Sequence, residues 1–300
     1  MFTLIDDCYM NELSVLIPTH NRPSSLNRTL ESLDNQTYGE NFICFISDNN
    51  SEKKTKEIVD YWIQKDTKFE IQYFKQDKDL LPIENWEFLI QKSSTKYTKI
   101  LFDDDWIKPT FISVVLEKMK SEKAACVVTN IDIFVEKNNS KETRNDYFKV
   151  ESGHLSKANI IDHFAELGPR INVSPSASIM VTDKLKEAFY YSLKNTECTK
   201  KVIGNDLVMN YYYLFNSDKV YYMNESLAIC GANNDSITVS TDDRHLFYCY
   251  LNTLIGLIND FNTELSKEQT KNLRKKISKQ KIRAVFRNDY KKLITNELNV

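Results

Sequence analysis

The chain has 300 residues, of which 41% are hydrophobic and 12% aromatic, so it can bury a substantial core and intrinsic disorder is not expected. Its six glycines and six prolines exclude collagen-like and linker-rich architectures. The net charge is only −2, but a basic C-terminal segment and an acidic body together produce that balance.

No targeting or membrane-spanning segment is expected. The N-terminus, MFTLIDDCYMNELSVLIP, lacks the basic start and uninterrupted apolar stretch of a signal peptide. No window approaches the run of about 18 apolar residues that indicates a transmembrane helix. The cysteines are scattered, without a C-x-x-C pair, so free thiols in a reducing cytosol are expected rather than disulfides or a zinc site. They are Cys8, Cys44, Cys126, Cys198, Cys230 and Cys249.

Buried-strand patterns and helical patterns alternate along the first half of the chain. The expected strands are 13–17, 42–47, 69–74, 97–102 and 124–136, and the expected helices are 24–36, 53–65, 82–94 and 109–123. This alternation with short connections predicts a parallel α/β sheet that is covered by helices on both faces.

The second half is less regular. SPSASIMV (174–181) predicts a strand, NDLVMNYYYLF (205–215) a helix, and KVYYMNESLAIC (219–230) a hairpin-like pair of strands. From about residue 242 the pattern is helical to the end. The aromatic cluster of 211–215 is expected to be packing, with sugar stacking as the alternative.

Polar segments follow three of the predicted strands. They are PTHNR (18–22), SDNNS (47–51) and DDDW (103–106). Ligands of such sheets bind at the carboxyl ends of the strands. None of these segments is a Gly-rich phosphate loop. A carboxylate cluster can instead hold a hard divalent cation, and such a cation can neutralise a diphosphate leaving group.

Each acidic candidate also has a structural interpretation. The run Asp103–Asp105 could be a charged turn in which Asp105 caps the next helix. Asp48 could form an Asx-turn, and Asp206 could be the N-cap of its own helix. His20 could be a loop histidine without a chemical role.

Four segments in order carry a family resemblance. LSVLIPTHNRPSSLNRTLESL, ISDNNSEKKT, ENWEFLIQKSSTKYTKILFDDDWIKP and the later GND resemble the motifs of inverting glycosyltransferases of family 2. The resemblance covers about 12–240. It implies an α/β fold of the GT-A type, Rossmann-like and mostly parallel, with helices on both faces. We expect a GT-A domain at 1–240, with a nucleotide-binding half at about 12–135 and an acceptor half at about 136–240, followed by a helical, basic extension at 241–300.

The resemblance also implies donor-site roles. Asp48 matches the acid that binds the base, usually uracil. The aspartate run matches the D-x-D motif that binds the ribose and a Mn²⁺ or Mg²⁺ on the diphosphate. Counting back from Pro109 places Asp104 as the metal ligand and Asp103 near the ribose, with Asp105 as a second ligand, a brace of the loop or a contact to the sugar. Phe102 stands where the first acid is common. The loop that lines the nucleotide pocket matches Pro18, Thr19, Asn21 and Arg22.

On the acceptor side, inverting transfer needs a carboxylate that takes the proton of the attacking hydroxyl. Asp206 matches the catalytic base, and Asn205 stands where a Glu is common. Ser176, within the strand that resembles the flank of the acceptor pocket, and Trp106, beside the acids, are candidates for the acceptor or sugar pocket.

The expected function is metal-dependent inverting transfer of a hexosyl or N-acetylhexosaminyl group. The donor would be a UDP-linked sugar, and the acceptor a hydroxyl of a bacterial surface glycan, such as lipopolysaccharide or capsule, free or lipid-linked. The alternatives are a sugar nucleotidyltransferase, a non-catalytic glycan- or nucleotide-binding module of the same fold, and a retaining transferase.

The C-terminal segment differs in charge from the rest of the chain. From Ser266 to Lys292 it carries eleven basic and two acidic residues, a net charge of +9 that leaves −11 for the rest of the chain. A helix at 266–293 could lie on an anionic membrane surface, or pack its apolar side on the domain. Nucleic-acid binding is not expected, because no recognition module accompanies the charge. The expected location is the cytoplasm, with peripheral attachment to the inner face of the plasma membrane as a hypothesis.

Overall fold

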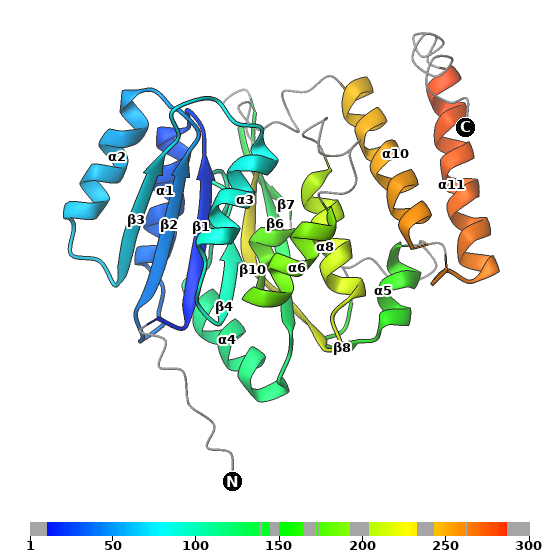
Figure 1. The fold of residues 1–300 in the computed structure, drawn as a ribbon, viewed down its shortest axis with the longest axis horizontal. Coiled ribbons are helices and arrows are strands. Elements are labelled where there is room, and N and C mark those ends of the chain that lie inside the picture. Colours follow the sequence, from blue (N-terminus) through cyan, green and yellow to red (C-terminus); the bar gives the residue numbers. More distant parts are fainter. Residues whose placement is uncertain are drawn as a thin grey trace.

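The core of the protein is a mixed β-sheet with helices on both faces (Figure 1). The computed structural model describes residues 11–137, 140–144, 150–164, 172, 174–192, 204–232, 243–261 and 263–286. Within these residues the sheet has ten strands. Eight follow the order β3-β2-β1-β4-β9-β6-β10-β5, while β7 pairs with β6 and β8 with β10.

The first half of the chain forms the regular, parallel part of this sheet. Strands β1 (Leu13–Thr19), β2 (Phe42–Asp48), β3 (Phe69–Lys75) and β4 (Tyr97–Ile100) are mutually parallel. They are connected by helices α1 (Pro23–Asp34), α2 (Lys53–Gln64) and α3 (Pro82–Lys92). The predicted alternation of strands and helices is confirmed here, with bounds that differ by one to a few residues.

The second half adds antiparallel strands to the sheet. Strand β9 pairs antiparallel with β4 and β6, and β10 runs parallel to β6. Strands β5 and β8 pair antiparallel with β10, and β7 pairs antiparallel with β6. The elements are β5 (Trp106–Ile107), α4 (Phe111–Glu122), β6 (Cys126–Lys137), β7 (Ser140–Arg144), β8 (Gly153–Leu155), α5 (Lys157–Phe164), the 3₁₀ turn η1 (Pro175–Ala177), β9 (Ser178–Val181), α6 (Thr182–Ser192), α8 (Asn205–Phe215) and β10 (Val220–Ala232).

Two sequence predictions for this half need correction. The expected hairpin-like pair at 219–230 is one continuous strand, β10, whose register to β6 shifts between Met223 and Ser226 and again between Ser226 and Ala228. These irregularities contain the polar NES segment, which imitates a turn in the sequence. The expected strand at 174–181 begins with the turn η1, because Pro175 cannot donate to a sheet hydrogen bond.

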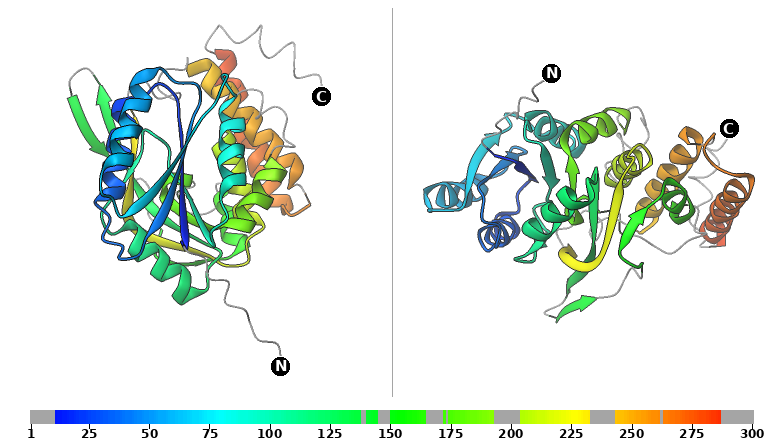
Figure 2. Two further views of the ribbon diagram at one scale, coloured as in Figure 1. Left: turned by 60° about the vertical axis from the view of Figure 1, so that its left-hand side comes forward. Right: turned by 90° about the horizontal axis from the view of Figure 1, so that it is seen from below.

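Alternate residues of the strands feed two hydrophobic clusters. Val15 and Ile17 face the cluster formed with α1, α2 and α4, while Leu16 faces the cluster formed with α3, α5, α6 and α8. This is the period of two that a strand imposes on its side chains. Figure 2 shows the two helical layers on either side of the sheet. The aromatic run at the end of α8 belongs to the second cluster, which confirms the expectation that it is packing.

The C-terminal helices α10 (Asp243–Asp260) and α11 (Lys267–Phe286) confirm the helical pattern. They join the second cluster through Leu257, Phe261 and Leu273. These helices share a hydrophobic core with the sheet. The domain boundary expected at residue 240 stays a prediction. Among the described residues, no helix combines the length and the apolar character that crossing a bilayer requires.

Candidate active site

The loops that follow β1 and β2 are joined to each other at the carboxyl edge of the sheet. The Asn49 amide donates to the Thr19 carbonyl over 2.9 Å, and the Asn21 amide donates to Ser51 Oγ over 2.8 Å. The side chain of Asn21 accepts from the Glu52 amide at 2.7 Å. Asn21 has a φ of 53°, a left-handed conformation that asparagine adopts more readily than most residues. The predicted nucleotide-pocket loop is therefore held in one shape.

A tight turn after β4, residues 102–105, carries the three carboxylates, and we call it the aspartate turn. The Asp103 carboxylate accepts from Thr19 Oγ1 at 2.8 Å and from Arg22 Nη1 at 3.0 Å. Arg22 Nη1 also contacts Asp104 Oδ2 at 3.3 Å. One guanidinium from the first loop thus clamps two neighbouring carboxylates. The structure brings Thr19, Arg22, Asp103 and Asp104 together as the sequence predicts, whereas Pro18 lies within β1, paired with Ser47 of β2.

The backbone of the aspartate turn is fixed by α1 and β10. Thr29 Oγ1 donates to the carbonyls of Asp105 and Asp103 over 2.7 and 3.1 Å. Arg28 Nη2 donates to the Asp104 carbonyl over 3.2 Å. A Cβ on Gly231 would lie 2.1 Å from that carbonyl oxygen, so β10 approaches as closely as only glycine allows.

The Asp105 carboxylate points into the protein. It accepts from the Gly231 amide at 3.0 Å, and burial raises its pKa, while hydrogen bonds from Ser176, Gly231 and Cys230 and the charge of Lys99 oppose that shift. These contacts identify Asp105 as a brace between the turn and β10. Its predicted role as a second metal ligand stays a prediction, and with only 2% of the residue exposed it would require the turn to open.

A buried lysine lies beneath the turn. Lys99 of β4 is fully buried, donates to the Ser176 carbonyl over 2.5 Å, and lies 4.0 Å from the centroid of the Phe111 ring. Burial lowers the pKa of Lys99 to about 7, and the charge of Asp105 opposes that shift. Ser176, predicted for the acceptor pocket, is itself buried and contributes to this support.

Asp104 is the least enclosed of the three carboxylates. Desolvation, followed by the charges of Asp105 and Asp103, raises the pKa of Asp104 to about 8, while Arg22 opposes that shift. Among the described residues, no three His, Cys, Asp or Glu side chains converge on one point that could hold a metal ion. The oxygen donors of the turn nevertheless fit Mn²⁺ or Mg²⁺, because Mg²⁺ is commonly held by one or two carboxylates and completed by substrate phosphates.

Asp48 is fully buried at the end of β2. Its Oδ1 accepts from the Ser51 amide at 2.8 Å, and its Oδ2 accepts from the Tyr73 hydroxyl at 2.5 Å. The structure therefore shows the Asx-type turn that was the alternative interpretation of this residue. Its contact to a nucleotide base stays a prediction, and because Asp48 is fully buried, that contact requires the residues around it to move.

The GND segment begins α8. Gly204, with a φ of 90°, is the N-cap, so the alternative that Asp206 is the cap is wrong. Burial raises the pKa of Asp206, and the Leu207 amide opposes the shift. Burial raises the pKa of the Cys230 thiol, and the charges of Asp105, Asp104 and Asp206 add to that shift. Cys230 therefore lies within the electrostatic reach of both the aspartate turn and the predicted base.

Asn205 and Trp106 stay predictions for the acceptor side. Asn205 is buried, and its Nδ2 has no hydrogen-bond partner within the described part of the chain. Trp106 lies with one face 4.0 Å from the Arg28 guanidinium carbon and its ring 5.3 Å from that of Phe134. The capping role considered for Asp105 is wrong, because the N-cap of α4 is Thr110.

Sequence reasoning missed the residues that support the site. Arg28 and Thr29 lie within the first motif without an assigned role, Gly231 and Tyr73 had none either, and their contacts join elements distant in the chain. Lys99 had a signal, because a lone lysine within the apolar run YTKILF must be buried with a partner or break the strand. The ring centroids of Phe102 and Trp86 lie 5.1 Å apart, so Phe102 anchors the turn to α3.

Comparison with known proteins agrees with this geometry. The family model described as glycosyl transferase family 2 matches residues 14–187. A GalNAc(5)-diNAcBac-PP-undecaprenol beta-1,3-glucosyltransferase of Campylobacter jejuni is 27% identical over 265 residues, 87% of this chain and 78% of that protein. Abequosyltransferase RfbV of Salmonella typhimurium is 24% identical over 269 residues, 83% of this chain and 75% of that protein.

Solved structures show the same fold. The structure of S. aureus TarS 1–349 in complex with UDP-GlcNAc matches with a TM-score of 0.64 at 14% identity, over 90% of this chain and 72% of that one. A longer TarS chain matches with the same TM-score of 0.64 at 13% identity, and this chain spans 43% of its length. The GT-A-type fold is thereby confirmed.

The match over more than half of the chain defines the class of protein: the chain belongs to glycosyltransferase family 2. It is a glycosyltransferase, and the alternative of a sugar nucleotidyltransferase falls away.

Proposed function

We propose that this enzyme transfers a hexosyl or N-acetylhexosaminyl group from a UDP-linked donor to a hydroxyl of a lipid-linked surface glycan, with inversion at the anomeric carbon. The named activities of the relatives support the acceptor class, since one of them is named for an undecaprenol diphosphate-linked glycan. The UDP-GlcNAc complex of a protein with the same fold supports the donor class.

The proposal is supported by two buried acidic groups that stand in different environments. Asp104 is clamped by Arg22 in the aspartate turn, and Asp206 lies at the start of α8, with Cys230 within reach of both charges. Leaving-group stabilisation and proton removal need two such groups on opposite sides of a reacting carbon. Buried carboxylates also make stronger bases than exposed ones, because desolvation disfavours the charged form.

In this mechanism Asp206 accepts the proton of the acceptor hydroxyl as its oxygen attacks the anomeric carbon. Asp104 would hold Mn²⁺ or Mg²⁺, which supplies positive charge for the departing diphosphate. Arg22 orients Asp103 and Asp104, and Asp103 would lie near the donor ribose. Arg28, Thr29 and Gly231 keep the turn from moving while charge develops on the leaving group.

Isosteric substitutions test the two roles. We expect Asp104→Asn and Asp206→Asn each to lower transfer by roughly a hundredfold or more, since each removes a charge that acts in the transition state. Only Asp104→Asn should weaken Mn²⁺-dependent binding of a UDP-sugar, measured by thermal shift. Asp34→Asn, an ion-paired residue at the end of α1 away from the aspartate turn, is the control and should behave as wild type.

If the Asp206→Asn variant kept wild-type turnover, Asp206 would be excluded as the catalytic base. A non-catalytic binding module would release no UDP from any donor in the presence of Mn²⁺. A retaining transferase would give a product with the donor's anomeric configuration, which proton NMR of the product reads directly.

A further inference from the structure

Helix α11 presents a basic surface to solvent. The helix contains eight lysines and arginines and a single acid, Glu268, a net charge of +7. Its exposed cations, which we call the outer face of α11, are Lys267, Lys271, Arg274, Lys275 and Lys279. None of these five has an ion-pair partner among the described residues. On α2, by contrast, Lys53 and Lys56 pair with Glu57 and Asp60.

The opposite side of α11 is anchored to the fold. Leu273 is fully buried in the second cluster, and Gln269 Nε2 donates to Asp162 Oδ1 of α5 over 2.7 Å. Ser266 and Gln269 form a reciprocal cap at the start of the helix, with bonds of 2.8 and 3.1 Å. This apolar side therefore packs on the domain, and the cations of the outer face form the surface that is accessible to a binding partner.

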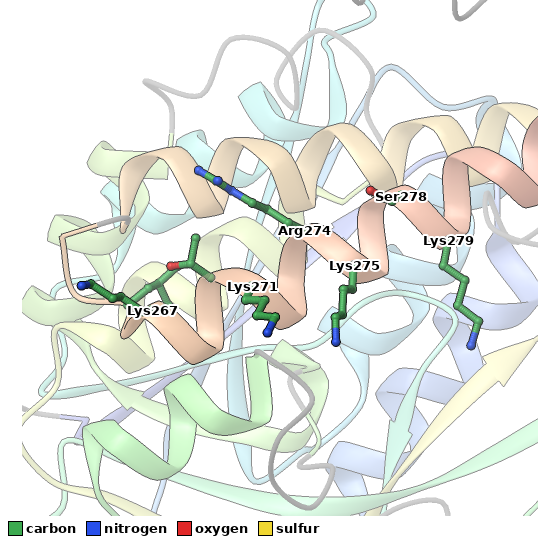
Figure 3. A pocket seen from close by; sticks show the side chains of 8 residues that line it. Lys267, Lys271, Arg274, Lys275, Ser278 and Lys279 are labelled. Carbon is green, nitrogen blue, oxygen red and sulfur yellow. The ribbon is translucent and has the colours of Figure 1, made fainter.

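The cations of the outer face are regularly spaced along a hollow. Figure 3 shows Lys271, Lys275 and Lys279 projecting in the same direction from successive turns. Positions four apart on a helix are about 6 Å apart along its axis. The hollow has a volume of about 840 Å³, and its described lining residues run from Leu265 to Lys279. A row of cations with space beside it suits phosphate groups that lie in a surface.

The charge of the rest of the protein orients such a contact. The whole chain carries −2, so the chain outside α11 carries −9. An anionic surface would repel this remainder and attract the outer face of α11. In Figures 1 and 2, α11 is the outermost element at the end of the molecule away from α2 and β3. The acidic body is thus turned away from a surface that α11 contacts.

We propose that the outer face of α11 docks on an anionic phospholipid surface. The purpose of that contact rests on the proposed function, because it would hold the active site near lipid-linked acceptors. The attraction is electrostatic and peripheral, with phosphate headgroups beside the lysine row and no insertion of the buried Leu273. Each basic residue close to such a surface strengthens binding severalfold. Three such residues together should therefore raise the partition onto the membrane by about a hundredfold.

Vesicle co-sedimentation of the full chain tests the proposal. We expect binding to vesicles of phosphatidylcholine mixed with phosphatidylglycerol, little binding to phosphatidylcholine alone, and weakening as salt is raised. The triple variant Lys271→Gln, Lys275→Gln and Lys279→Gln should lose about a hundredfold in partition. The control Lys53→Gln, Lys54→Gln and Lys56→Gln makes the same change of charge on exposed positions of α2 and should bind as wild type.

Equal binding by the α11 variant and the wild type would overturn the proposal, as would equal losses in the two triple variants. Binding to duplex RNA in preference to anionic vesicles would assign the face to nucleic acid instead. Transfer to a water-soluble acceptor should be unchanged in the α11 variant. Vesicle binding without any transfer would refute the proposed function and leave the docking surface standing, whereas transfer without vesicle binding would do the reverse.

Discussion

The aspartate turn and the outer face of α11 both gather like charges, and the structure treats them in opposite ways. In the turn each carboxylate is largely buried and has assigned partners, including Thr19, Arg22 and the Gly231 amide. On α11 five cations project into solvent without ion-pair partners in the described part of the chain.

The difference matches the roles proposed for the two regions. A charge that acts on one atom of a substrate must be held in place, and burial strengthens its interaction while making it costly to maintain. A charge that attracts a surface contributes through the summed field, so its position within a few ångströms matters little. Substitutions in the aspartate turn should therefore lower transfer and stability strongly, whereas substitutions on the outer face of α11 should change stability little.

The largest loss is expected for Gly231→Ala. The new Cβ would meet the Asp104 carbonyl oxygen, 2.1 Å away, and Arg28 Nη2, 3.3 Å away. The carbonyl is backbone, so the turn has to move. We expect transfer to fall by about a hundredfold and the free energy of unfolding by about 1–3 kcal/mol. Transfer kinetics and urea denaturation measure the two effects.

Gly153→Ala in β8 is the matched control, because an added Cβ there meets no atom within 4 Å. Its kinetics and unfolding should match wild type. A Gly231→Ala protein with normal kinetics would mean that the turn tolerates displacement, and the contrast between the two regions would then be weaker than the contacts indicate.

A smaller effect is expected in the pH dependence of stability. The pKa of Asp104 is raised from 3.8 to about 8, so between those values the folded protein holds a proton that the unfolded chain has released. Stability therefore falls as pH rises through this window. Asp104→Asn removes this contribution, and its Tm should decline less than that of wild type between pH 5 and about 8.5 in metal-free buffer. Identical slopes would show that Arg22 keeps Asp104 ionised throughout.

The smallest effect is expected on α11. The triple variant Lys271→Gln, Lys275→Gln and Lys279→Gln should change the free energy of unfolding by less than about 0.5 kcal/mol, because glutamine preserves helix propensity and no ion pair is lost. Thermal denaturation measures this. A large loss of Tm would mean that these lysines support the fold, and the contrast between the aspartate turn and the outer face of α11 would then be wrong.

The sequence predicted the parallel half of the sheet well, because its signals are local. Three buried strands, the half-exposed edge strand β3 and the helices between them each carry their own periodicity, and α8 has the predicted bounds. Strand β10 escaped prediction, because its shifts of register are accommodated by pairing with β6, which lies 94 residues earlier in the chain at the Val220–Cys126 pair. A polar NES segment inside a strand resembles a turn until its partner strand is known.

The site followed the same division. The motif residues Thr19, Arg22, Asp103 and Asp104 come together because the topology places the ends of β1 and β4 side by side. Motif counting singled out Asp104 as the metal ligand but left Asp105 open between a second ligand, a brace of the loop and a contact to the sugar. Burial and partners from α1 and β10 make that distinction, and neither can be read from the aspartate run alone.

Gly204 bears on where this enzyme could be shortened. An added Cβ there would lie 2.3 Å from Thr253 Oγ1, so the start of α8, next to Asp206, rests directly on α10. The family model ends at residue 187, before both elements. A truncated enzyme that stopped before α10 would keep every family motif and still lack the surface against which the start of α8, with the proposed base Asp206, is packed. The smallest active fragment should therefore be longer than the family match.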